Sequence, residues 1–275
     1  MTDERPLEEL VRYEVADGIA RITIDREDAR NALTWDMRDR LGDLFEEASV
    51  DLNVRAVVLS GTGKAFCAGA DLRKRQATAP RPDDAPKYTA GDITRMLQEG
   101  WQRLVSTVLD CAKPVIVVVN GIAAGGGCQL ALAGDLVVAS HDAAFTEVFV
   151  KRGIVPDAGA AYLVTRLVGP QKAKELFFFG DKVSAADAHA MGLVNKVVPA
   201  DQLDAAVDEW AKRLAVAPTK AIAMTKSLVN KAFESDRATA LHDEAVGQEI
   251  VQKTTDAGEG VQAFVERRDP AFKGW

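Results

Sequence analysis

The sequence has few cysteines and histidines, and it has no long apolar run. Three cysteines cannot form a disulfide framework, and three scattered histidines cannot form a zinc cluster. Neither disulfide bonds nor a structural metal site are therefore expected to stabilise the fold. No segment approaches the ~20 apolar residues that cross a bilayer, and the polar, acidic N-terminus does not resemble a signal or transit peptide. These absences predict a soluble, cytoplasmic protein in a reducing setting, with no metal and no membrane partner.

Positive charge is also in deficit. The chain has 34 Lys and Arg residues against 41 Asp and Glu residues, a formal net charge of -7. Binding to nucleic acid needs surplus cations that neutralise phosphates, so nucleic acid is excluded as a partner, whereas a small anionic ligand needs only a local basic patch. With 275 residues, of which 47% are hydrophobic and 27% charged, the chain is globular and long enough to bury a core.

Strand and helix patterns alternate in the first half of the sequence, and helical patterns fill the last third. β-Branched runs predict strands, and apolar spacings of three and four predict helices. Thr34 stands where the first long helix needs an N-cap. Three prolines and little apolar content over 73–91 indicate a mobile surface segment. Strands are expected over 11–15, 18–24, 55–60, 114–119, 135–139 and 193–198, and helices over 31–48, 93–111, 128–133 and 158–167.

Two glycine-rich turns each follow a predicted buried strand and lead towards a helix. They are KAFCAGADL (64–72) and NGIAAGGGCQL (120–130). Small residues let a ligand approach the backbone, and two N–H groups that converge on one oxygen make an oxyanion hole. The alternative is that the glycines serve only tight turns and close packing. Neither GxGxxG spacing nor a Walker A lysine is present, so a nucleotide site is not expected.

In order along the chain, these motifs resemble those of the crotonase superfamily, also called the enoyl-CoA hydratase/isomerase family. The motifs are closest to its branch of isomerases linked to phenylacetate breakdown. The matching segments are REDARNAL (26–33), AFCAGADL (65–72), KPVIVVVNGIAAGGGCQLAL (113–132), GIVPDAGAAYLVTRLVG (153–169), KVSAADAHAMGLVNKVVP (182–199) and FVERRDPAFKG (264–274).

The resemblance implies an α/β fold, a spiral of ββα units with a C-terminal helical region that supports trimer assembly. Residues 1–200 would form the spiral core, which binds acyl-CoA and performs catalysis. Residues 201–275 would form the helical region, which mediates oligomerisation and covers CoA. The implied partners are an acyl-CoA substrate and copies of the chain in a homotrimer or hexamer. No separate cofactor is expected, because coenzyme A is carried by the substrate.

The resemblance also implies a set of site residues. The backbone N–H groups of Ala70 and Gly126 would hold the thioester oxygen. Arg73 would meet a CoA phosphate, because a guanidinium pairs well with phosphate, or it is an ordinary solvated charge. Arg267 would reach CoA from a neighbouring subunit. The further residues expected to contact acyl-CoA are Asp28, Ala29, Ala68, Gly69, Ala70 itself, Asp71, Leu72 and Phe149.

The chain departs from the hydratase pattern at both carboxylate positions. Hydration needs one group to deprotonate water and another to protonate the α carbon, work that paired carboxylates do well. Gln129 takes the first position, where an amide holds water but does not titrate. Phe149 takes the second. Glu147 either faces the same way on an extended backbone or is a solvated or ion-paired glutamate, and the latter is expected because most carboxylates lie at the surface.

One carboxylate, Asp157 in VPDAG, stands where isomerases of this family place a catalytic aspartate. It is either that aspartate or the N-cap of the helix predicted over 158–167. Burial among Phe149, Val150 and Val155 would raise its pKa and make it a competent base. A single carboxylate suits an isomerase, which removes a proton from one carbon and returns it to another.

The predicted catalytic residues are therefore Asp157 and Gln129, and the favoured reaction is the shift of a double bond in an enoyl-CoA. Two alternatives stay open. One is hydration of a 2-enoyl-CoA to a 3-hydroxyacyl-CoA, with Gln129 and another acid holding the water. The other is a catalytically weak homologue that only binds acyl-CoA.

Overall fold

Two β-sheets organise the chain in the computed structural model, which describes residues 5–73, 82–86 and 89–275. Within these residues the larger sheet has the strand order β1-β2-β3-β5-β7-β10 and the smaller sheet β4-β6-β8-β9. The pairs β1–β2 and β8–β9 are antiparallel, and the other neighbours are parallel. The strands are β1 (Val11–Ala16), β2 (Ile19–Ile24), β3 (Ala56–Gly61), β4 (Ala65–Cys67), β5 (Val115–Val119), β6 (Ile122–Ala124), β7 (Leu136–Ser140), β8 (Ala144–Thr146), β9 (Lys182–Ser184) and β10 (Lys196–Val198).

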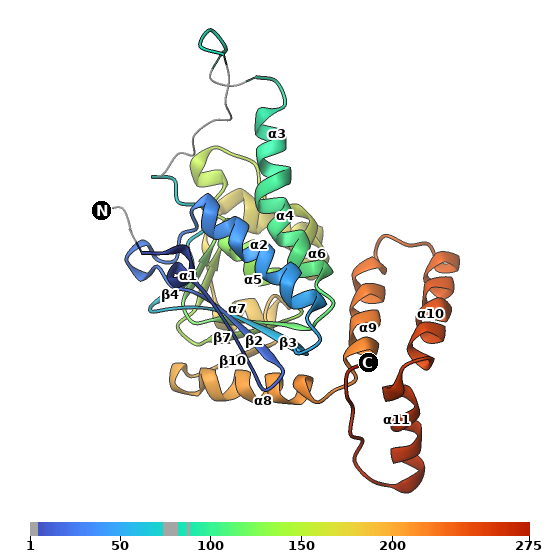
Figure 1. Ribbon diagram of the computed structural model, residues 1–275. Helices are drawn as coiled ribbons and strands as arrows, with labels where there is room; N and C mark the ends of the chain where they lie inside the picture. The colour runs from blue at the N-terminus through green and yellow to red at the C-terminus, as the bar shows by residue number, and fades with distance from the viewer. Residues whose placement is uncertain (1–4, 74–81, 87–88) are drawn as a thin grey trace.

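Helices connect the strands and form the C-terminal part (Figure 1). The α-helices are α1 (Leu7–Leu10), α2 (Trp35–Val50), α3 (Asp92–Leu97), α4 (Arg103–Asp110), α5 (Gly126–Leu132), α6 (Ala160–Phe179), α7 (Ala185–Ala190), α8 (Leu203–Ala215), α9 (Thr219–Lys231), α10 (Arg237–Gln252) and α11 (Thr255–Glu266). Short 3-10 turns are η1 (Glu27–Ala29), η3 (Val150–Arg152) and η4 (Ala200–Gln202), and a π-helical segment, η2 (Gln98–Gln102), joins α3 to α4. No helix in the described ranges is both long and apolar enough to span a membrane.

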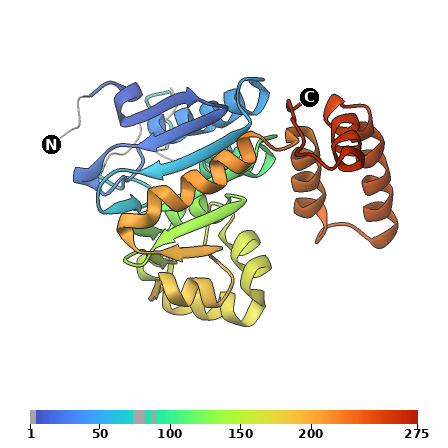
Figure 2. The same ribbon diagram turned by 90° about the horizontal axis from the view of Figure 1, so that it is seen from below.

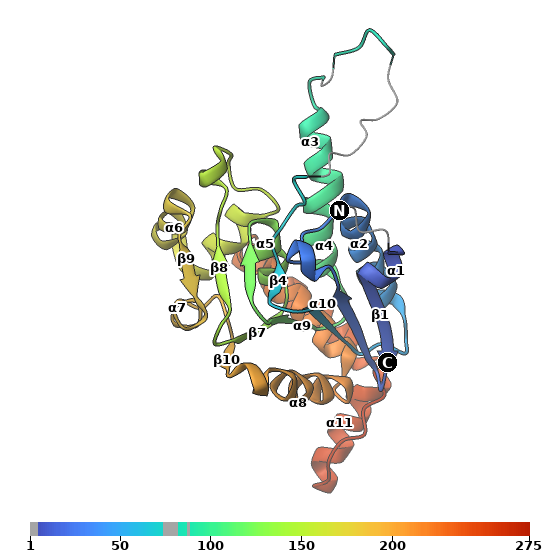
Figure 3. The same ribbon diagram turned by 90° about the vertical axis from the view of Figure 1, so that its left-hand side faces the viewer.

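A repeated step links the two sheets. Each of β3, β5 and β7 lies in the larger sheet and is followed directly by a strand of the smaller sheet, β4, β6 and β8 respectively. Helices follow the first two pairs and return the chain to the larger sheet, as parallel neighbours require. After the third pair, α6 leads to β9 of the smaller sheet, and α7 then leads to β10 of the larger sheet. This is the predicted spiral of ββα units, and Figure 3 shows the two sheets with α3 projecting away from them.

The strand β5 is buried on both faces, as its uninterrupted apolar run predicts. Val115, Val117 and Val119 face the main core, whereas Ile116 and Val118 belong to a second apolar cluster beneath α8. Figure 2 shows α8 lying across the larger sheet. α8 begins at Leu203 and packs against the larger sheet, and the predicted division of the chain at residue 200 stays a prediction.

The sequence patterns located most long elements and the short strand β10, but they missed four other short strands. The N-terminal hairpin, the Thr34 cap of α2, and β3, β5 and β7 are confirmed. β4, β6, β8 and β9 have three residues each, too few for a period to show. The prediction for 73–91 falls largely outside the described residues.

The helices α9, α10 and α11 form an arm that stands apart from the sheets (Figures 1 and 2). Lys226 of α9 anchors the arm: its ammonium group lies 2.8 Å from the Asp135 carboxylate and 2.9 Å from the Val108 carbonyl oxygen. The arm exposes large apolar side chains, among them Phe233 and Phe264, which is 85% exposed. A second copy of the chain would cover such a surface, and the predicted homotrimer or hexamer stays a prediction.

Asn31 fixes the backbone that leads to the first glycine-rich turn. Its side chain accepts a hydrogen bond from Arg26 N (2.8 Å) and donates to the carbonyl oxygens of Thr62 (2.9 Å) and Ala65 (2.7 Å). Its backbone is left-handed, with φ +56°, a conformation that Asn tolerates better than most residues. Asn31 therefore ties the end of β2 to both ends of the turn between β3 and β4.

We predict that Asn31→Ala lowers the free energy of unfolding by about 3 kcal/mol, because buried polar backbone groups lose their partners and a left-handed backbone strains alanine. Urea denaturation followed by circular dichroism measures the change. Asn53→Ala is the matched control, because the side chain of exposed Asn53 hydrogen-bonds the nearby Asp51, and its loss should cost below about 1 kcal/mol. Equal losses in the two variants would contradict the assigned role of Asn31.

Candidate functional site

The first glycine-rich turn is held by Leu33, at the chain segment before α2. Leu33 N donates to Gly69 O (2.8 Å), and Asp71 N donates to Leu33 O (2.9 Å), a parallel bridge opposite Ala70. These two bonds use the carbonyl oxygen of Gly69 and the N–H of Asp71, the backbone groups on either side of Ala70. The N–H of Ala70 itself therefore points away from Leu33. It has no hydrogen-bond acceptor in the described part of the chain.

The second turn places the start of α5 against the first. Gly125 N donates to Thr146 O of β8 (3.0 Å), and φ +52° with ψ −123° at Gly125 favours glycine. The next N–H, that of Gly126, opens the helix and finds no acceptor among the described residues. A Cβ atom added to Gly69 would lie 3.4 Å from Gly126 N, so the two turns are in contact.

Trp101 covers the start of α5. A Cβ atom added to Gly126 would lie 2.8–2.9 Å from three atoms of its indole ring, so only glycine fits beneath it. Trp101 belongs to the π-helical segment η2, where Gly100 departs from helical geometry and packs against the Arg38 guanidinium. The helical pattern over 93–111 contained no signal for this placement, because the break in the helix decides where the indole points.

Glu147 is buried beside Gln129, which corrects the expectation of a surface glutamate. It is 4% exposed and forms no ion pair within the described residues. Gln129 Nε2 donates to both Glu147 Oε1 and Oε2, each at 2.9 Å. Glu147 directly follows β8 and Gln129 lies on α5, so the contact depends on how these elements pack.

No cation in the part of the chain that the structure describes offsets the burial of the Glu147 carboxyl. Burial raises its pKa from 4.5 to about 7, and hydrogen bonds from Gln129 and Cys128 oppose the rise only in part. The amide oxygen of Gln129, Oε1, is buried and has no hydrogen-bond partner in the described structure. The pair thus combines a carboxyl group that titrates near neutral pH with an unpartnered acceptor.

Asp157 does not cap the following helix. α6 begins at Ala160, its N-cap is Gly159 with φ +79°, and no side chain caps it. The Asp157 side chain is half-buried, accepts no hydrogen bond from the described residues, and has a pKa raised by that burial. Two of its expected neighbours are too exposed to bury it, since Val150 is 42% exposed and Val155 78%, whereas Phe149 is buried.

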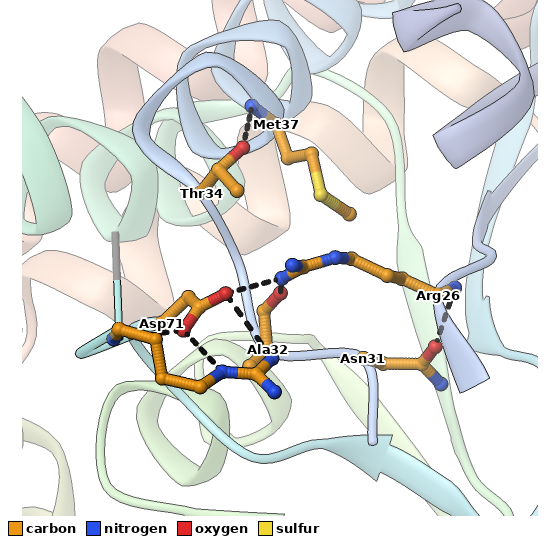
Figure 4. A network of polar contacts seen from close by, with 7 residues as sticks. Arg26, Asn31, Ala32, Thr34, Met37 and Asp71 are labelled. Carbon is orange, nitrogen blue, oxygen red and sulfur yellow. Dashed lines mark hydrogen bonds and ion pairs between the residues drawn. The ribbon is translucent and has the colours of Figure 1, made fainter. Parts of the chain in front are cut away.

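Asp71 anchors the first turn through two arginines (Figure 4). Its buried carboxylate lies 2.7 Å from Arg26 Nη1 and 3.1 Å from Arg73 Nε. Burial would raise the pKa of Asp71, but hydrogen bonds from Arg73 and Arg26 outweigh it and hold the pKa well below its usual range. Arg73 is largely exposed, so Asp71 holds a surface guanidinium in a defined orientation beside the turn.

The remaining predicted contact residues lie at different distances from the turns. Asp28 and Ala29 form the surface turn η1, and Ala68 and Leu72 flank the bridge to Leu33, with Leu72 exposed. Arg267 is exposed and follows the end of α11, a helix of the arm that stands apart from the sheets (Figure 1). The structure shows no hydrogen bond or ion pair between Arg267 and the turns within the described residues, and its predicted contact from a neighbouring subunit stays a prediction.

Known proteins are similar to this chain over nearly all of its length. The family model described as Enoyl-CoA hydratase/isomerase matches residues 14–275. The "1,2-epoxyphenylacetyl-CoA isomerase" of Escherichia coli is 33% identical over 97% of this chain and 99% of that protein. The "Probable enoyl-CoA hydratase" of Rhodobacter capsulatus is 36% identical over 96% and 98%. The solved structure of an enoyl-CoA hydratase from Bacillus anthracis has a TM-score of 0.87 at 32% identity, covering 97% of this chain and 100% of that one.

The contact between the two turns should not tolerate a side chain at Gly127. A Cβ atom there would collide with the Cys67 carbonyl oxygen, which is backbone and cannot rotate away. We predict that Gly127→Ala lowers the free energy of unfolding by about 1–3 kcal/mol through overpacking. Gly258→Ala in α11, where nothing lies within 4 Å, is the control and should be neutral or stabilising by up to about 1 kcal/mol. An undiminished Gly127→Ala stability would refute the close contact.

The raised pKa of Glu147 makes folding stability depend on pH. Between pH 4.5 and about 7 the folded chain holds a proton on Glu147 that the unfolded chain has lost, so stability falls as pH rises and levels off above about 7. The shift corresponds to about 3 kcal/mol. We predict that Glu147→Gln gains stability relative to the unmodified protein from pH 5 to pH 8, up to that amount, in urea titrations.

Glu249→Gln is the control for the loss of one negative charge, because Glu249 is exposed. If the stability difference between Glu147→Gln and the unmodified protein were the same at pH 5 and pH 8, the raised pKa would be wrong.

Proposed function

Since the chain belongs to the enoyl-CoA hydratase/isomerase family, we propose that it shifts the carbon–carbon double bond of an enoyl-CoA, with Asp157 as the proton shuttle. The observation that supports the proposal is that Asp157 is half-buried without a hydrogen-bond partner. Its half-buried carboxylate has no hydrogen-bond partner in the described structure and does not cap α6, so no structural task accounts for it.

The proposed reaction needs one base and one oxyanion site. The N–H groups of Ala70 and Gly126 hold the thioester oxygen. Asp157 takes a proton from C2 of a 3-enoyl-CoA, and the electron pair spreads into a dienolate whose charge rests on that oxygen. The protonated Asp157 then delivers the proton to C4, which leaves the double bond between C2 and C3. One proton leaves and one returns, so no further reactant is needed.

The surroundings of Asp157 and of the Gly126 N–H group support the roles proposed for them. A base whose pKa is raised by burial holds and releases a proton more readily near neutral pH. Trp101 packs over Gly126 and keeps water from that side of α5, which strengthens hydrogen bonds to a developing negative charge. Enzymes of this family need no cofactor beyond the coenzyme A of the substrate.

Other residues of the proposed site bind rather than react. Arg73 would meet a CoA phosphate through its guanidinium group, and its ion pair with Asp71 supports this role because it orients that group. Arg267 would reach CoA from a neighbouring subunit of a homotrimer or hexamer, an assembly that we include in the proposal because the arm exposes an apolar surface.

Hydration of a 2-enoyl-CoA is the second candidate, and the Glu147–Gln129 pair favours it. A carboxyl group with a pKa of about 7 beside an amide with a free acceptor is suited to holding water. The water oxygen would add to C3 and a proton to C2 as the double bond becomes single. Assays of isomerisation and hydration on the same enoyl-CoA substrates separate the two candidates from each other and from a homologue that only binds acyl-CoA.

We predict that Asp157→Asn lowers the rate of 3-enoyl-CoA isomerisation about 10²–10⁴-fold, the usual loss for a general base, with little change in acyl-CoA affinity. The melting temperature should not fall, because the side chain caps no helix and its charge is disfavoured by burial. Asp181→Asn, an exposed aspartate paired at 3.5 Å with Lys151, is the matched control. An Asp157→Asn protein with full isomerase activity would overturn the proposed mechanism.

A further inference from the structure

Arg38 of α2 is a buried cation that has no part in the proposed reaction. Its side chain is 7% exposed. The guanidinium donates to Asp39 Oδ1 through Nε (2.8 Å) and Nη2 (2.6 Å), and its Cζ atom lies 4.9 Å from the centre of the Trp35 ring. These contacts hold the guanidinium in one place. Burying a charge is costly, and apolar residues in place of a buried ion pair are often no less stable, so stability alone does not account for Arg38.

Gly100 lies directly against this guanidinium. A Cβ atom added to Gly100 would overlap Arg38 Nη1 and lie 2.8 Å from Arg38 Cζ. Gly100 belongs to the π-helical segment η2 and departs from helical geometry, with φ −104° and ψ −106°. A π-helical turn holds one residue more than an α-helical turn, so a break here sets the direction in which the next side chain points. The fixed guanidinium therefore lies against the backbone at the point where that direction is decided.

The next side chain is that of Trp101, which is 9% exposed. Its indole ring lies 2.8–2.9 Å from the place that a Cβ atom on Gly126 would take, so the ring touches the backbone at the start of α5. A continuous line of contacts thus runs from Arg38 through Gly100 and Trp101 to Gly126. If the N–H of Gly126 holds the thioester oxygen, as proposed above, this line ends at the donor that stabilises the negative charge. The inference rests on that part of the proposed function.

We propose that Arg38 is a positioning residue, which sets the place of Trp101 over Gly126 and, through the indole ring, the direction of the Gly126 N–H group. An oxyanion donor lowers the barrier only where it points at the developing charge, and a misplacement of about 1 Å can cost about 10²-fold in rate. Arg38 acts through Trp101, and none of the bonds that form or break involves it.

Arg103 provides a matched control, because it joins the same two helical segments through different contacts. It lies on α4, and its Nη2 donates to Asp43 Oδ1 (2.7 Å) and Glu46 Oε1 (2.9 Å) of α2. A Cβ atom added to Gly42 of α2 would lie 3.2 Å from Arg103 Nη1. Arg103 therefore makes the same kind of contact between an arginine and a glycine, but it uses no residue of η2.

The test measures enoyl-CoA turnover in Gly100→Ala, Arg38→Met and the double variant of the full-length protein. The methyl group of Gly100→Ala should displace η2 against the fixed guanidinium and lower kcat about 10²-fold, with KM changed by less than about 3-fold. Arg38→Met only loosens the contact and should lower kcat about 10-fold. Because methionine makes room for the methyl group, the double variant should also lose about 10-fold, whereas independent losses would multiply to about 10³-fold. Arg103→Met should keep kcat within about 2-fold.

A second measurement follows Trp101 itself and needs no turnover. The chain has four tryptophans, so protein labelled with fluorotryptophan gives four fluorine NMR resonances, and that of Trp101 is the one lost in Trp101→Phe. This resonance should shift or broaden in Gly100→Ala and in Arg38→Met, and the double variant should resemble Arg38→Met. It should move least in Arg103→Met.

Three results would overturn the proposal: losses of kcat that multiply in the double variant, a Trp101 resonance that neither Gly100→Ala nor Arg38→Met changes, or a loss in Arg103→Met as large as that in Arg38→Met. If the protein hydrates 2-enoyl-CoA instead of isomerising 3-enoyl-CoA, kcat for hydration becomes the measurement, because the same thioester oxygen gains charge. Failure of the proposed isomerisation is then seen separately, as absent isomerase turnover with the coupling between Arg38 and Gly100 preserved.

Discussion

Two backbone turns approach each other more closely than any side chain would permit, and the rest of the site depends on that approach. Gly127 lies against the Cys67 carbonyl, and Gly69 faces Ala124 O and Gly126 N. The parallel neighbours β4 and β6 bring the turns side by side, and the neighbouring segments then hold each one. Leu33 holds the first and Thr146 the second, and the N–H groups of Ala70 and Gly126 have no acceptor among the described residues.

Two buried carboxyl groups near these turns show how neighbours decide the charge state of the same functional group. Asp71 lies between two guanidinium groups, which stabilise its ionised form and lower its pKa. Glu147 meets a neutral amide and a thiol, neither of which offsets its loss of hydration, and its pKa rises to about 7. The first group is a permanent anion that fixes a turn, and the second can gain or lose a proton near neutral pH.

The arm of α9, α10 and α11 is relevant to the proposed assembly of several chains rather than to the fold of one chain. Its anchor, Lys226, is buried against Asp135 and the carbonyl oxygen of Val108, so the start of the arm is fixed to the body. Its outer side chains, such as Phe264, remain uncovered in one chain. An apolar surface of this kind gains stability only when something covers it, which is why the proposed assembly and the proposed role of Arg267 stand together.

Much of the fold could be predicted from the sequence alone, because its signals are local. The apolar run of β5, the Thr34 cap and the glycine-rich turns depend on residues that are neighbours in sequence. The position of Asp157 could be predicted too, but only the start of α6 at Ala160 showed that it is free of a capping role. The burial of Glu147 could not be predicted. It depends on the packing of β8 against α5, which brings together residues 18 positions apart, and without that contact the glutamate would be one more solvated charge.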